Sequence, residues 1–250
     1  MKIDSILILA AGRGIRLKPH TDNTPKSLLP LGNTNILRRL LEQSEMYFSG
    51  VKVYVNASYL AEKIINEISN CPIVRRPIII WEQNPLGPAL TVTNHCNETS
   101  SNVLVLHGDI FFSDQCFSEF SKSIIQKEQD GSILLCHQRS NQNARSRIIR
   151  KGGLIQSILE INVTSQIIND KEITSDLVWS NSGAIVVKKN SLLGFRPEIG
   201  EGISPSLINY IASNGDLCLE ECKGTRIAID NERAYFEAIK ANQKNEGLLN

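Results

Sequence analysis

Two glycines behind an apolar run, followed by an arginine and a lysine, form the stretch of this sequence best suited to chemistry. Residues 6–11 are apolar and lead directly into Gly12 and Gly14, and Arg16 and Lys26 follow. Glycine has no Cβ, so such a loop can turn tightly and direct several backbone N–H groups at one ligand. Arginine adds a forked planar donor and lysine a mobile point charge. The stretch therefore predicts a phosphate-binding loop.

Two common glycine-rich loops do not fit the spacing. The third glycine of the dinucleotide-binding fingerprint would fall at Leu17, and the Walker loop needs a Lys-Ser or Lys-Thr pair directly after its last glycine. A plain turn is the remaining alternative for a Gly-x-Gly pair taken alone.

A longer pattern surrounds the pair and resembles a known signature. Residues 10–19 read Ala-Ala-Gly-x-Gly-x-Arg-Leu-x-Pro and residues 25–30 read Pro-Lys-x-Leu-x-Pro, which is similar to the sugar-phosphate nucleotidyltransferases. Those enzymes join a nucleoside triphosphate to a sugar phosphate and release pyrophosphate. The resemblance implies nucleotide binding at Leu9, Ala10, Ala11, Gly12, Gly14 and Gly87, and catalytic roles for Arg16, Lys26 and Asp109. Ile15 departs from the usual Ser or Thr, which removes one hydroxyl contact and leaves the backbone cradle intact.

A carboxylate follows the apolar run at residues 103–106. Gly108 and Asp109 come at the end of this expected strand, where the phosphate loop would also open if the two strands were parallel neighbours. Mg²⁺ takes oxygen ligands and bridges one or two carboxylates to substrate phosphates. An isolated aspartate at a strand end more often caps a turn. The resemblance implies that Asp109 binds the catalytic magnesium.

A second metal ligand is expected near the last helix, in one of two registers. Many sugar-type members have the aspartate seven residues before a tyrosine, where this chain has Ala228, counted from Tyr235. Others, which resemble choline-phosphate cytidylyltransferase, have Ile-Asp five residues before it, as in Ile229-Asp230. We therefore expect Asp230 as the second ligand, with an N-cap of the last helix as its alternative role.

The acceptor side of the sequence is less informative. Residues 82–89 resemble the family's Pro-Leu-Gly-Thr-Ala segment, which packs on base or ribose, but Pro88 replaces the threonine and leaves the base preference open. The resemblance implies acceptor binding at Glu160, Asn181 and Gly183, although plain strand and turn roles are equally compatible. The lysine that usually follows the glutamate is missing, because Ile161 stands there.

The elements that must position these residues alternate between strand and helix. Short apolar runs at 51–55, 77–81, 103–106 and 132–136 are separated by helical patterns at 35–48, 60–68, 87–96 and 114–129, the last beginning after a Ser113 cap. This order predicts βαβ units and a Rossmann-like nucleotide-binding half. In the second half we expect strands at 153–161, 181–187 and 225–229 and helices at 205–213 and 232–243. The resemblance implies a three-layer α/β/α sandwich with a mostly parallel mixed sheet, GT-A-like in type. One domain over residues 1–250 is expected, its nucleotide-binding half ending near 136 and its acceptor-binding half covering 137–250.

Composition excludes some partners. The 250 residues carry a formal net charge of +1 and are 41% hydrophobic, so no global field attracts nucleic acid, and no run is long enough to span a membrane. The six cysteines include no Cys-x-x-Cys pair and indicate thiols in a reducing compartment. We expect a cytoplasmic protein that binds a nucleoside triphosphate and a sugar 1-phosphate, and a homo-oligomer stays open.

The predicted function is a magnesium-dependent sugar-1-phosphate nucleotidyltransferase that serves NDP-sugar and cell-surface polysaccharide biosynthesis. A phosphate monoester is largely ionised at neutral pH, so positioning and charge neutralisation, not a general base, would drive its attack on the triphosphate. Three alternatives remain: a cytidylyltransferase acting on a non-sugar phosphate such as phosphocholine, a GT-A-type glycosyltransferase, and a non-catalytic homologue. The glycosyltransferase would need a second aspartate in an Asp-x-Asp motif, and Phe111 stands there instead.

Overall fold

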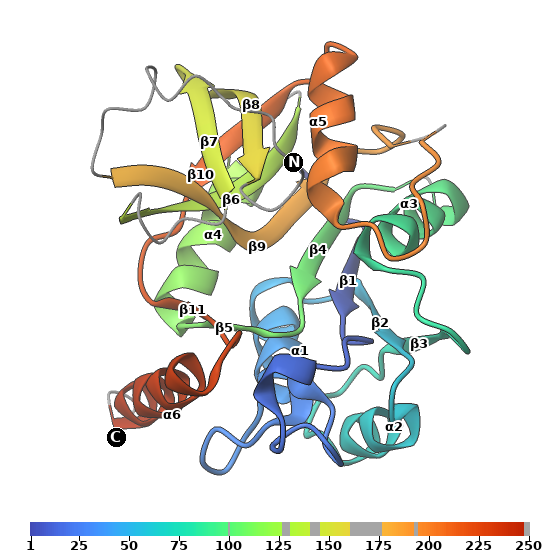
Figure 1. Ribbon diagram of the computed structural model, residues 1–250, viewed down its shortest axis with the longest axis vertical. Helices are drawn as coiled ribbons and strands as arrows, with labels where there is room; N and C mark the ends of the chain where they lie inside the picture. Colours follow the sequence, from blue (N-terminus) through green and yellow to red (C-terminus); the bar gives the residue numbers. More distant parts are fainter. Residues whose placement is uncertain (100, 127–130, 141–145, 161–176, 193–194, 248–250) are drawn as a thin grey trace.

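The protein is built on a sheet that passes through both halves of the chain (Figure 1). The computed structural model describes residues 1–99, 101–126, 131–140, 146–160, 177–192 and 195–247. The strands of this sheet are β1 Ser5–Leu9, β2 Lys52–Ala57, β3 Ile78–Trp81, β4 Val103–His107, β6 Ser132–Ser140, β7 Ser146–Lys151, β8 Leu154–Glu160, β9 Leu177–Val187 and β10 Leu217–Glu221. Within the described ranges their order is β3-β2-β1-β4-β9-β6-β10-β8-β7. Two further strands, β5 Ile110–Phe112 and β11 Arg226–Ala228, form a small antiparallel sheet of their own.

The sheet is mixed, as expected, but its parallel pairings are concentrated in the first half. Strands β3, β2, β1 and β4 run parallel, and so do β6 and β10. The pairings β4–β9, β6–β9, β7–β8, β7–β9 and β8–β10 are antiparallel. A short turn at Gly152 and Gly153 joins β7 to β8, and a connection of that length can only pair strands antiparallel. The expected mostly parallel sheet therefore applies to the nucleotide-binding half and not to the second half.

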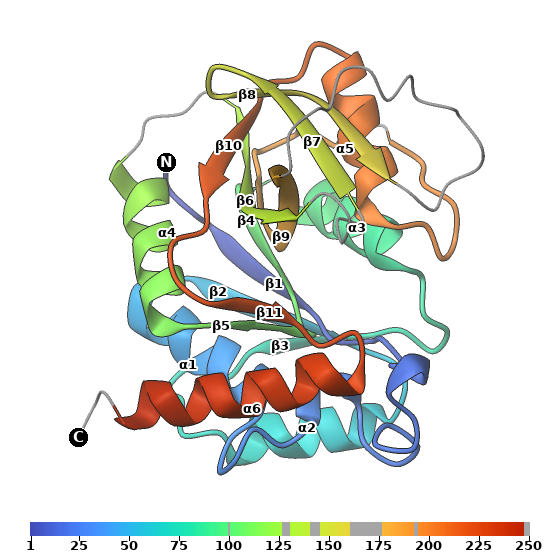
Figure 2. The same ribbon diagram turned by 60° about the vertical axis from the view of Figure 1, so that its left-hand side comes forward.

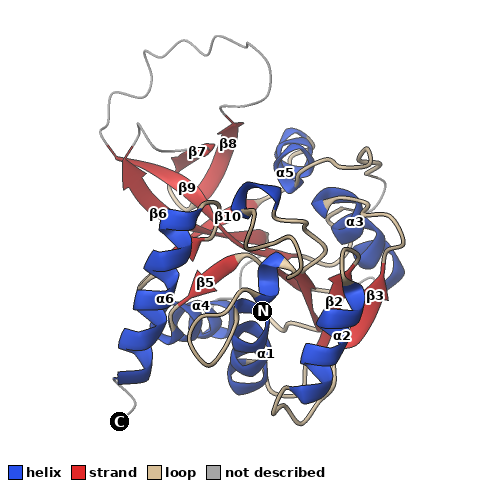
Figure 3. Ribbon diagram, turned by 60° about the horizontal axis from the view of Figure 1, so that its bottom comes forward, coloured by secondary structure: helices blue, strands red, loops and turns tan. Residues whose placement is uncertain are grey.

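Helices cover both faces of the sheet, which confirms the three-layer α/β/α arrangement (Figures 2 and 3). They are α1 Ile36–Tyr47, α2 Ala61–Asn70, α3 Pro88–Thr99, α4 Asp114–Gln126, α5 Ile203–Ala212 and α6 Glu232–Gly247. Successive side chains of a strand point to opposite faces, so β1 contributes to two cores. Ile6 and Ile8 pack in a cluster with residues of α1, α2 and α4, whereas Leu7 packs with residues of α3 and α5.

Most expected elements are present near their expected bounds. The Ser113 cap is confirmed, because its Oγ accepts the N–H of Cys116 at 3.2 Å as α4 begins. The strand expected at 225–229 exists as β11, but it pairs with β5 and not with the main sheet. Strands β5, β7 and β10 were not expected from the sequence.

Two composition-based expectations can be compared with the structure. None of the helices in the described ranges is long and apolar enough to cross a membrane. No disulfide joins any of the six cysteines, all of which the structure describes. Burial raises the pKa of the Cys96 thiol to about 12, so this side chain stays a protonated, packed thiol.

Candidate active site

The ends of β1 and β4 bring two candidate segments to one edge of the sheet. The strands pair in parallel with Leu9 opposite His107, so the loops that follow them open on the same side. The N–H of Gly108 donates to the carbonyl of Leu9 at 2.9 Å. A Cβ on Gly108 would lie 2.6 Å from that oxygen, so only glycine permits this approach. Asp109 is thereby held at the mouth of the glycine loop.

The glycine loop is fixed on one side and open on the other. Gly14 has a φ of +62°, and the hydroxyl of Thr21 donates to its carbonyl at 2.8 Å. A Cβ on Gly14 would lie 3.0 Å from the Cβ of Lys26, in a backbone region that disfavours L residues. A Cβ on Gly12 would meet no heavy atom within 4 Å. A ligand therefore has room beside Gly12.

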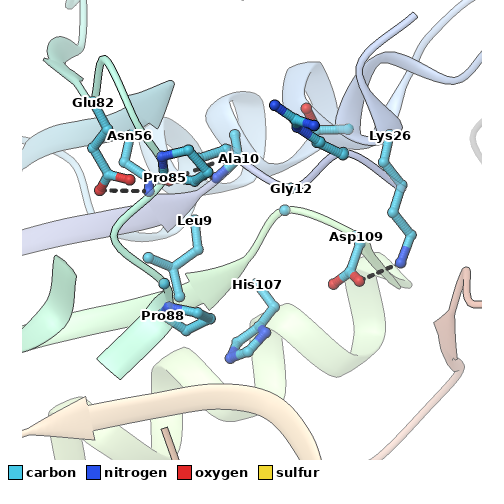
Figure 4. Close-up of a pocket in the computed structure, with 15 residues that line it drawn as sticks. Leu9, Ala10, Gly12, Lys26, Asn56, Glu82, Pro85, Pro88, His107 and Asp109 are labelled. Carbon is cyan, nitrogen blue, oxygen red and sulfur yellow. Dashed lines mark hydrogen bonds and ion pairs between the residues drawn. The ribbon is translucent and has the colours of Figure 1, made fainter. Parts of the chain in front are cut away.

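Asn56 on β2 holds the beginning of this loop. Its Oδ1 accepts the N–H groups of Ala10 at 2.6 Å and Ala11 at 3.3 Å (Figure 4). Its Nδ2 donates to Oε1 of Glu82 at 3.1 Å. Asn56 is 4% exposed, so these hydrogen bonds lie away from water. The Asn56 side chain therefore fixes the direction in which the chain enters the loop.

Glu82 extends this network to the segment expected near the base. Its Oε1 also accepts the hydroxyl of Thr91 at 2.5 Å, and its Oε2 accepts the N–H of Leu86 at 3.0 Å. The carboxylate is 5% exposed, and in the described structure no cation lies within ion-pair distance of it. A buried carboxylate is tolerated where several donors satisfy it. The Asn56–Glu82 network thus links the phosphate loop to residues 85–88.

A cavity of about 280 Å³ lies between these segments (Figure 4). Its lining comes from the glycine loop, the 82–88 segment and the end of β4, and comprises Leu9, Ala10, Ala11, Gly12, Arg13, Lys26, Ser27, Asn56, Glu82, Pro85, Gly87, Pro88, His107, Gly108 and Asp109. Apolar walls with a few convergent polar groups are typical of small-molecule sites. The cavity has the lining expected of a nucleotide site.

Lys26 lies between the two aspartates that the sequence singled out. Its Nζ is 2.5 Å from Oδ2 of Asp109 and 3.5 Å from Oδ1 of Asp230. Burial raises the pKa of the Asp109 carboxyl, but the charge and hydrogen bond of Lys26 lower it by more, and the net pKa lies below the ordinary value. Asp109 is therefore an anion at neutral pH.

The alternative role of Asp230 as a helix cap is wrong. Oδ1 of Asn231 accepts the N–H of Ala234 at 2.9 Å, so Asn231 caps the start of α6. Asp230, one residue earlier, directs its carboxylate at Lys26. The two aspartates therefore converge on one cationic point although they lie 121 residues apart in the sequence.

A second cavity, of about 290 Å³, adjoins the first and shares His107 and Asp109 with it. Its lining comes from the β4–β5 junction and from β6, β7, β9 and β11, and comprises His107, Asp109, Ile110, Arg139, Ser146, Ser180, Asn181, Gly183, Arg226, Ala228 and Asp230. Asp109 thus forms part of the wall between the two cavities. A reaction between a ligand in each cavity would take place beside this carboxylate.

His107 is the titratable base nearest this wall. Burial lowers the pKa of its imidazole, Arg226 and Lys26 lower it further, and Asp109 and Asp230 oppose them without reversing the shift. The ring is therefore neutral at neutral pH.

Most of the predicted site residues lie on the two cavities. Of the expected nucleotide-binding residues, Leu9, Ala10, Ala11, Gly12 and Gly87 line the first cavity, and Gly14 lies behind it against Lys26. Asn181 and Gly183, expected at the acceptor, line the second cavity with Asp109 and Asp230.

Of the two remaining predicted residues, Arg16 lies outside both cavities. Arg16 is exposed on the short helix Ile15–Leu17 and lines neither cavity, whereas Arg13 lines the first. Gly14, in the left-handed conformation, begins the helical turn that leaves Arg16 exposed. The backbone of Glu160 ends β8 opposite Ser146, and its side chain lies outside the described structure.

Sequence reasoning missed four residues of the site. Asn56 was not expected at the site, although a polar residue at the end of an apolar run is a usable signal. Glu82 was noticed only as part of its segment. Arg139 and Arg226 carried no local signal, because only the pairing of β6 with β9 and of β11 with β5 brings them to the second cavity.

Comparison with known proteins places this architecture among nucleotide-transferring enzymes. The sequence model of a family described as "MobA-like NTP transferase domain" matches residues 6–162. The bifunctional protein GlmU of Methanococcus maripaludis is 28% identical over 233 residues, which cover 87% of this chain and 49% of that protein. The chain therefore spans about half the length of this curated relative.

Solved structures with the same fold cover nearly the whole chain. A UDP-glucose pyrophosphorylase complexed with UDP-glucose has a TM-score of 0.73 and 17% identity, covering 97% of this chain and 99% of the other. The CTP:phosphocholine cytidylyltransferase of Streptococcus pneumoniae has a TM-score of 0.68 and 16% identity, covering 96% and 99%. At these identities the likeness shows the fold alone.

Proposed function

The chain belongs to the family of MobA-like NTP transferase domains, and from this premise we propose that it is a sugar-1-phosphate nucleotidyltransferase. It would join a nucleoside triphosphate to a sugar 1-phosphate and release pyrophosphate. The observation that carries the proposal is the meeting of the glycine loop, Lys26 and two carboxylates at the wall shared by two cavities. Nucleotide in the first cavity and acceptor in the second would face each other there.

The donor set fits magnesium. Asp109 and Asp230 offer carboxylate oxygens on either side of one cationic point, which Lys26 Nζ takes in this structure. Mg²⁺ in nucleotide sites needs only one or two carboxylates besides phosphate oxygens and water. Asp109 and Asp230 would hold the ion, which when bound neutralises charge on the triphosphate.

The remaining chemistry belongs to the chain itself. The backbone N–H groups beside Gly12 would bind phosphate oxygens, and Lys26 would turn from the carboxylates toward the triphosphate. The acceptor phosphate is already ionised and needs no proton removed, which agrees with the neutral His107. Catalysis would rest on alignment of the attacking phosphate with the pyrophosphate leaving group and on neutralising their repulsion.

The sugar class of acceptor is supported by several features of the comparisons and the sequence. The UDP-glucose pyrophosphorylase of similar fold holds a sugar nucleotide, and residues 85–87 and 181–183 resemble the sugar-type segments. A cytidylyltransferase acting on phosphocholine is the second candidate, since a structure of that title shares the fold and Asp230 fits its register. Both candidates predict pyrophosphate as a product.

A substrate panel tests the proposal. Each common nucleoside triphosphate is incubated with Mg²⁺ and either a set of sugar 1-phosphates or phosphocholine, and pyrophosphate release is recorded. Release with a sugar 1-phosphate supports the proposal, and release with phosphocholine alone replaces it by the second candidate. No release with any pair, while the nucleotide still binds, would indicate a non-catalytic homologue.

A further inference from the structure

Two arginines, Arg139 of β6 and Arg226 of β11, line the second cavity, and the proposed reaction has not yet given them a role. The two residues are 87 positions apart in the sequence. The fold brings them to one cavity because β6 pairs with β9 and β11 pairs with β5. Both residues are partly buried. Guanidinium groups stay charged in proteins, so the cavity holds two positive charges in limited contact with water.

Arg226 is positioned by the protein and not merely exposed to the cavity. Its Nε donates to the carbonyl of Ser182 at 2.9 Å, and Ser182 is fully buried on β9. The hydroxyl of Ser182 is in turn 3.0 Å from Nδ1 of His137. With Nε committed to the backbone, the terminal amines of Arg226 are the groups left to meet a ligand.

Within the part of the chain that the structure describes, neither guanidinium group forms an ion pair, although Asp109 and Asp230 act on Arg226 from a greater distance and favour its charged form. No described carboxylate lies within ion-pair distance of Arg139 or Arg226, and the two aspartates of the cavity face Lys26 instead. Ala228 of β11 also lines this cavity and adds no carboxylate to it. Because Asp109 and Asp230 pair with Lys26, the two guanidinium groups of the cavity remain available to bind an anion.

We propose that Arg139 and Arg226 bind the phosphate of the acceptor and make this cavity selective for phosphate esters that carry no cationic group. The inference rests on the proposed function, which places the acceptor here. Paired guanidinium groups match phosphate oxygens with several charge-assisted hydrogen bonds. They would supply the positive charge that the family usually places at the lysine missing from position 161. A quaternary ammonium group, as in phosphocholine, would meet two like charges, so the arginines also act against that acceptor.

Steady-state kinetics on glutamine variants test this role. Arg139→Gln and Arg226→Gln should each raise the KM for the sugar 1-phosphate at least about tenfold and leave the KM for the nucleotide within about twofold. Arg150→Gln is the matched control, because Arg150 lies on the exposed part of β7 over the Trp179 ring and lines neither cavity. An unchanged acceptor KM in both cavity variants, or an equal rise for nucleotide and acceptor, would overturn the role.

Direct binding separates this inference from the reaction itself. Equilibrium dialysis with radiolabelled inorganic phosphate should give an affinity that falls at least about tenfold in Arg226→Gln and is retained in Arg150→Gln, with melting temperatures measured beside it. Arg226→Lys keeps the charge and should lose less affinity than Arg226→Gln if that charge binds phosphate. Equal phosphate affinity in the wild-type protein and the three variants would overturn the proposed phosphate-binding role, even if pyrophosphate is released. If the cavity variants lose phosphate binding and the wild-type protein shows no turnover, the phosphate-binding role is supported and only the proposed reaction is rejected.

Discussion

The ammonium group of Lys26 lies within ion-pair distance of two carboxylates, those of Asp109 and Asp230. In the proposed reaction that charge moves to the triphosphate, where repulsion is the main obstacle. We predict that Lys26→Ala lowers kcat about a hundredfold or more, because one cation aimed at the developing charge is lost. Pyrophosphate release and thermal melting on the same preparation check this. Lys18→Ala is the control, since it removes an equal charge from an exposed pair with Asp22.

Arg16 is a more stringent test of the predicted site, because its side chain is exposed and lines neither cavity. We still expect Arg16→Ala to lower turnover strongly, because the spacing of Arg16 from Gly12 and Gly14 matches the family signature, and Arg13→Ala is the comparison. Near wild-type turnover in Arg16→Ala beside a large loss in Arg13→Ala would transfer the role to the arginine that already lines the cavity.

Asp230 and Asn231 are neighbours with separable roles. Asp230→Asn should raise the Mg²⁺ concentration for half-maximal rate several-fold, because one of two carboxylate ligands is lost, whereas Asp109→Asn should abolish most activity. Asn231→Ala removes the α6 cap and should reduce the free energy of unfolding by about 1 kcal/mol without moving the magnesium curve. Rate against Mg²⁺, with denaturant unfolding of each variant, distinguishes them. An unaltered magnesium curve in Asp230→Asn would leave a single-carboxylate site.

At the scale of elements, the glycine loop is held in place by β2, which carries Asn56, and by Glu82, which directly follows β3. Asn56→Ala leaves the N–H of Ala10 and one oxygen of Glu82 with fewer partners, which should lower the free energy of unfolding by about 1–3 kcal/mol. The loop would also lose its direction, so the KM for the nucleotide should rise about tenfold or more. Nucleotide kinetics and urea unfolding provide both numbers. Asn66→Ala, on the exposed face of α2, should change neither, and an unmoved KM in Asn56→Ala would deny the loop-positioning role.

The elements predictable from sequence were those whose signals are local. Apolar runs and helical periodicity indicated β1 to β4, β6, β8, β9, β11 and the six helices of the described ranges, and Ser113 marked the start of α4. The strand expected at 225–229 exists as β11, but its partner β5 is three residues long and has no pattern of its own, so the pairing of the two could not be predicted. The same reason hid Arg226, whereas Lys26 and Asp109 stood in segments that could be recognised by themselves. Asp230 could be named from its register, but its separation from the cap at Asn231 needed coordinates.

At the scale of the molecule, the site lies where the strand pairing of the sheet changes from parallel to antiparallel. β1 and β4 are parallel, and β9 next to β4 is antiparallel, so the end of β4 borders the first cavity on one side and the second cavity on the other. The first cavity is lined by residues 9–109, the second also by residues between 139 and 230, and His107 and Asp109 belong to both. This division is what a reaction between two phosphate-bearing substrates requires.

The fold also buries histidine in a neutral form, which links stability to pH. Burial lowers the pKa of His137 to about 3, with Arg226 and Arg139 adding to the effect. The unfolded chain takes up a proton near pH 6.5 and the folded chain does not, so the free energy of unfolding should fall as pH drops from 6.5 to 5. One such group contributes a slope of up to about 1.4 kcal/mol per pH unit. In His137→Gln, urea unfolding should show a shallower slope over this range, and an unchanged slope would contradict a neutral buried His137.

The identity and ratio of the products test the central claim most directly. ³¹P NMR of wild-type protein with Mg²⁺, the nucleoside triphosphate and the sugar 1-phosphate chosen by the panel should show a diphosphate diester and pyrophosphate growing in equal amounts. Both should be absent with Asp109→Asn, whose folding is checked by its melting curve. Nucleoside monophosphate with pyrophosphate, nucleoside diphosphate with inorganic phosphate, or an unchanged spectrum would contradict transfer of a nucleotidyl group to the acceptor.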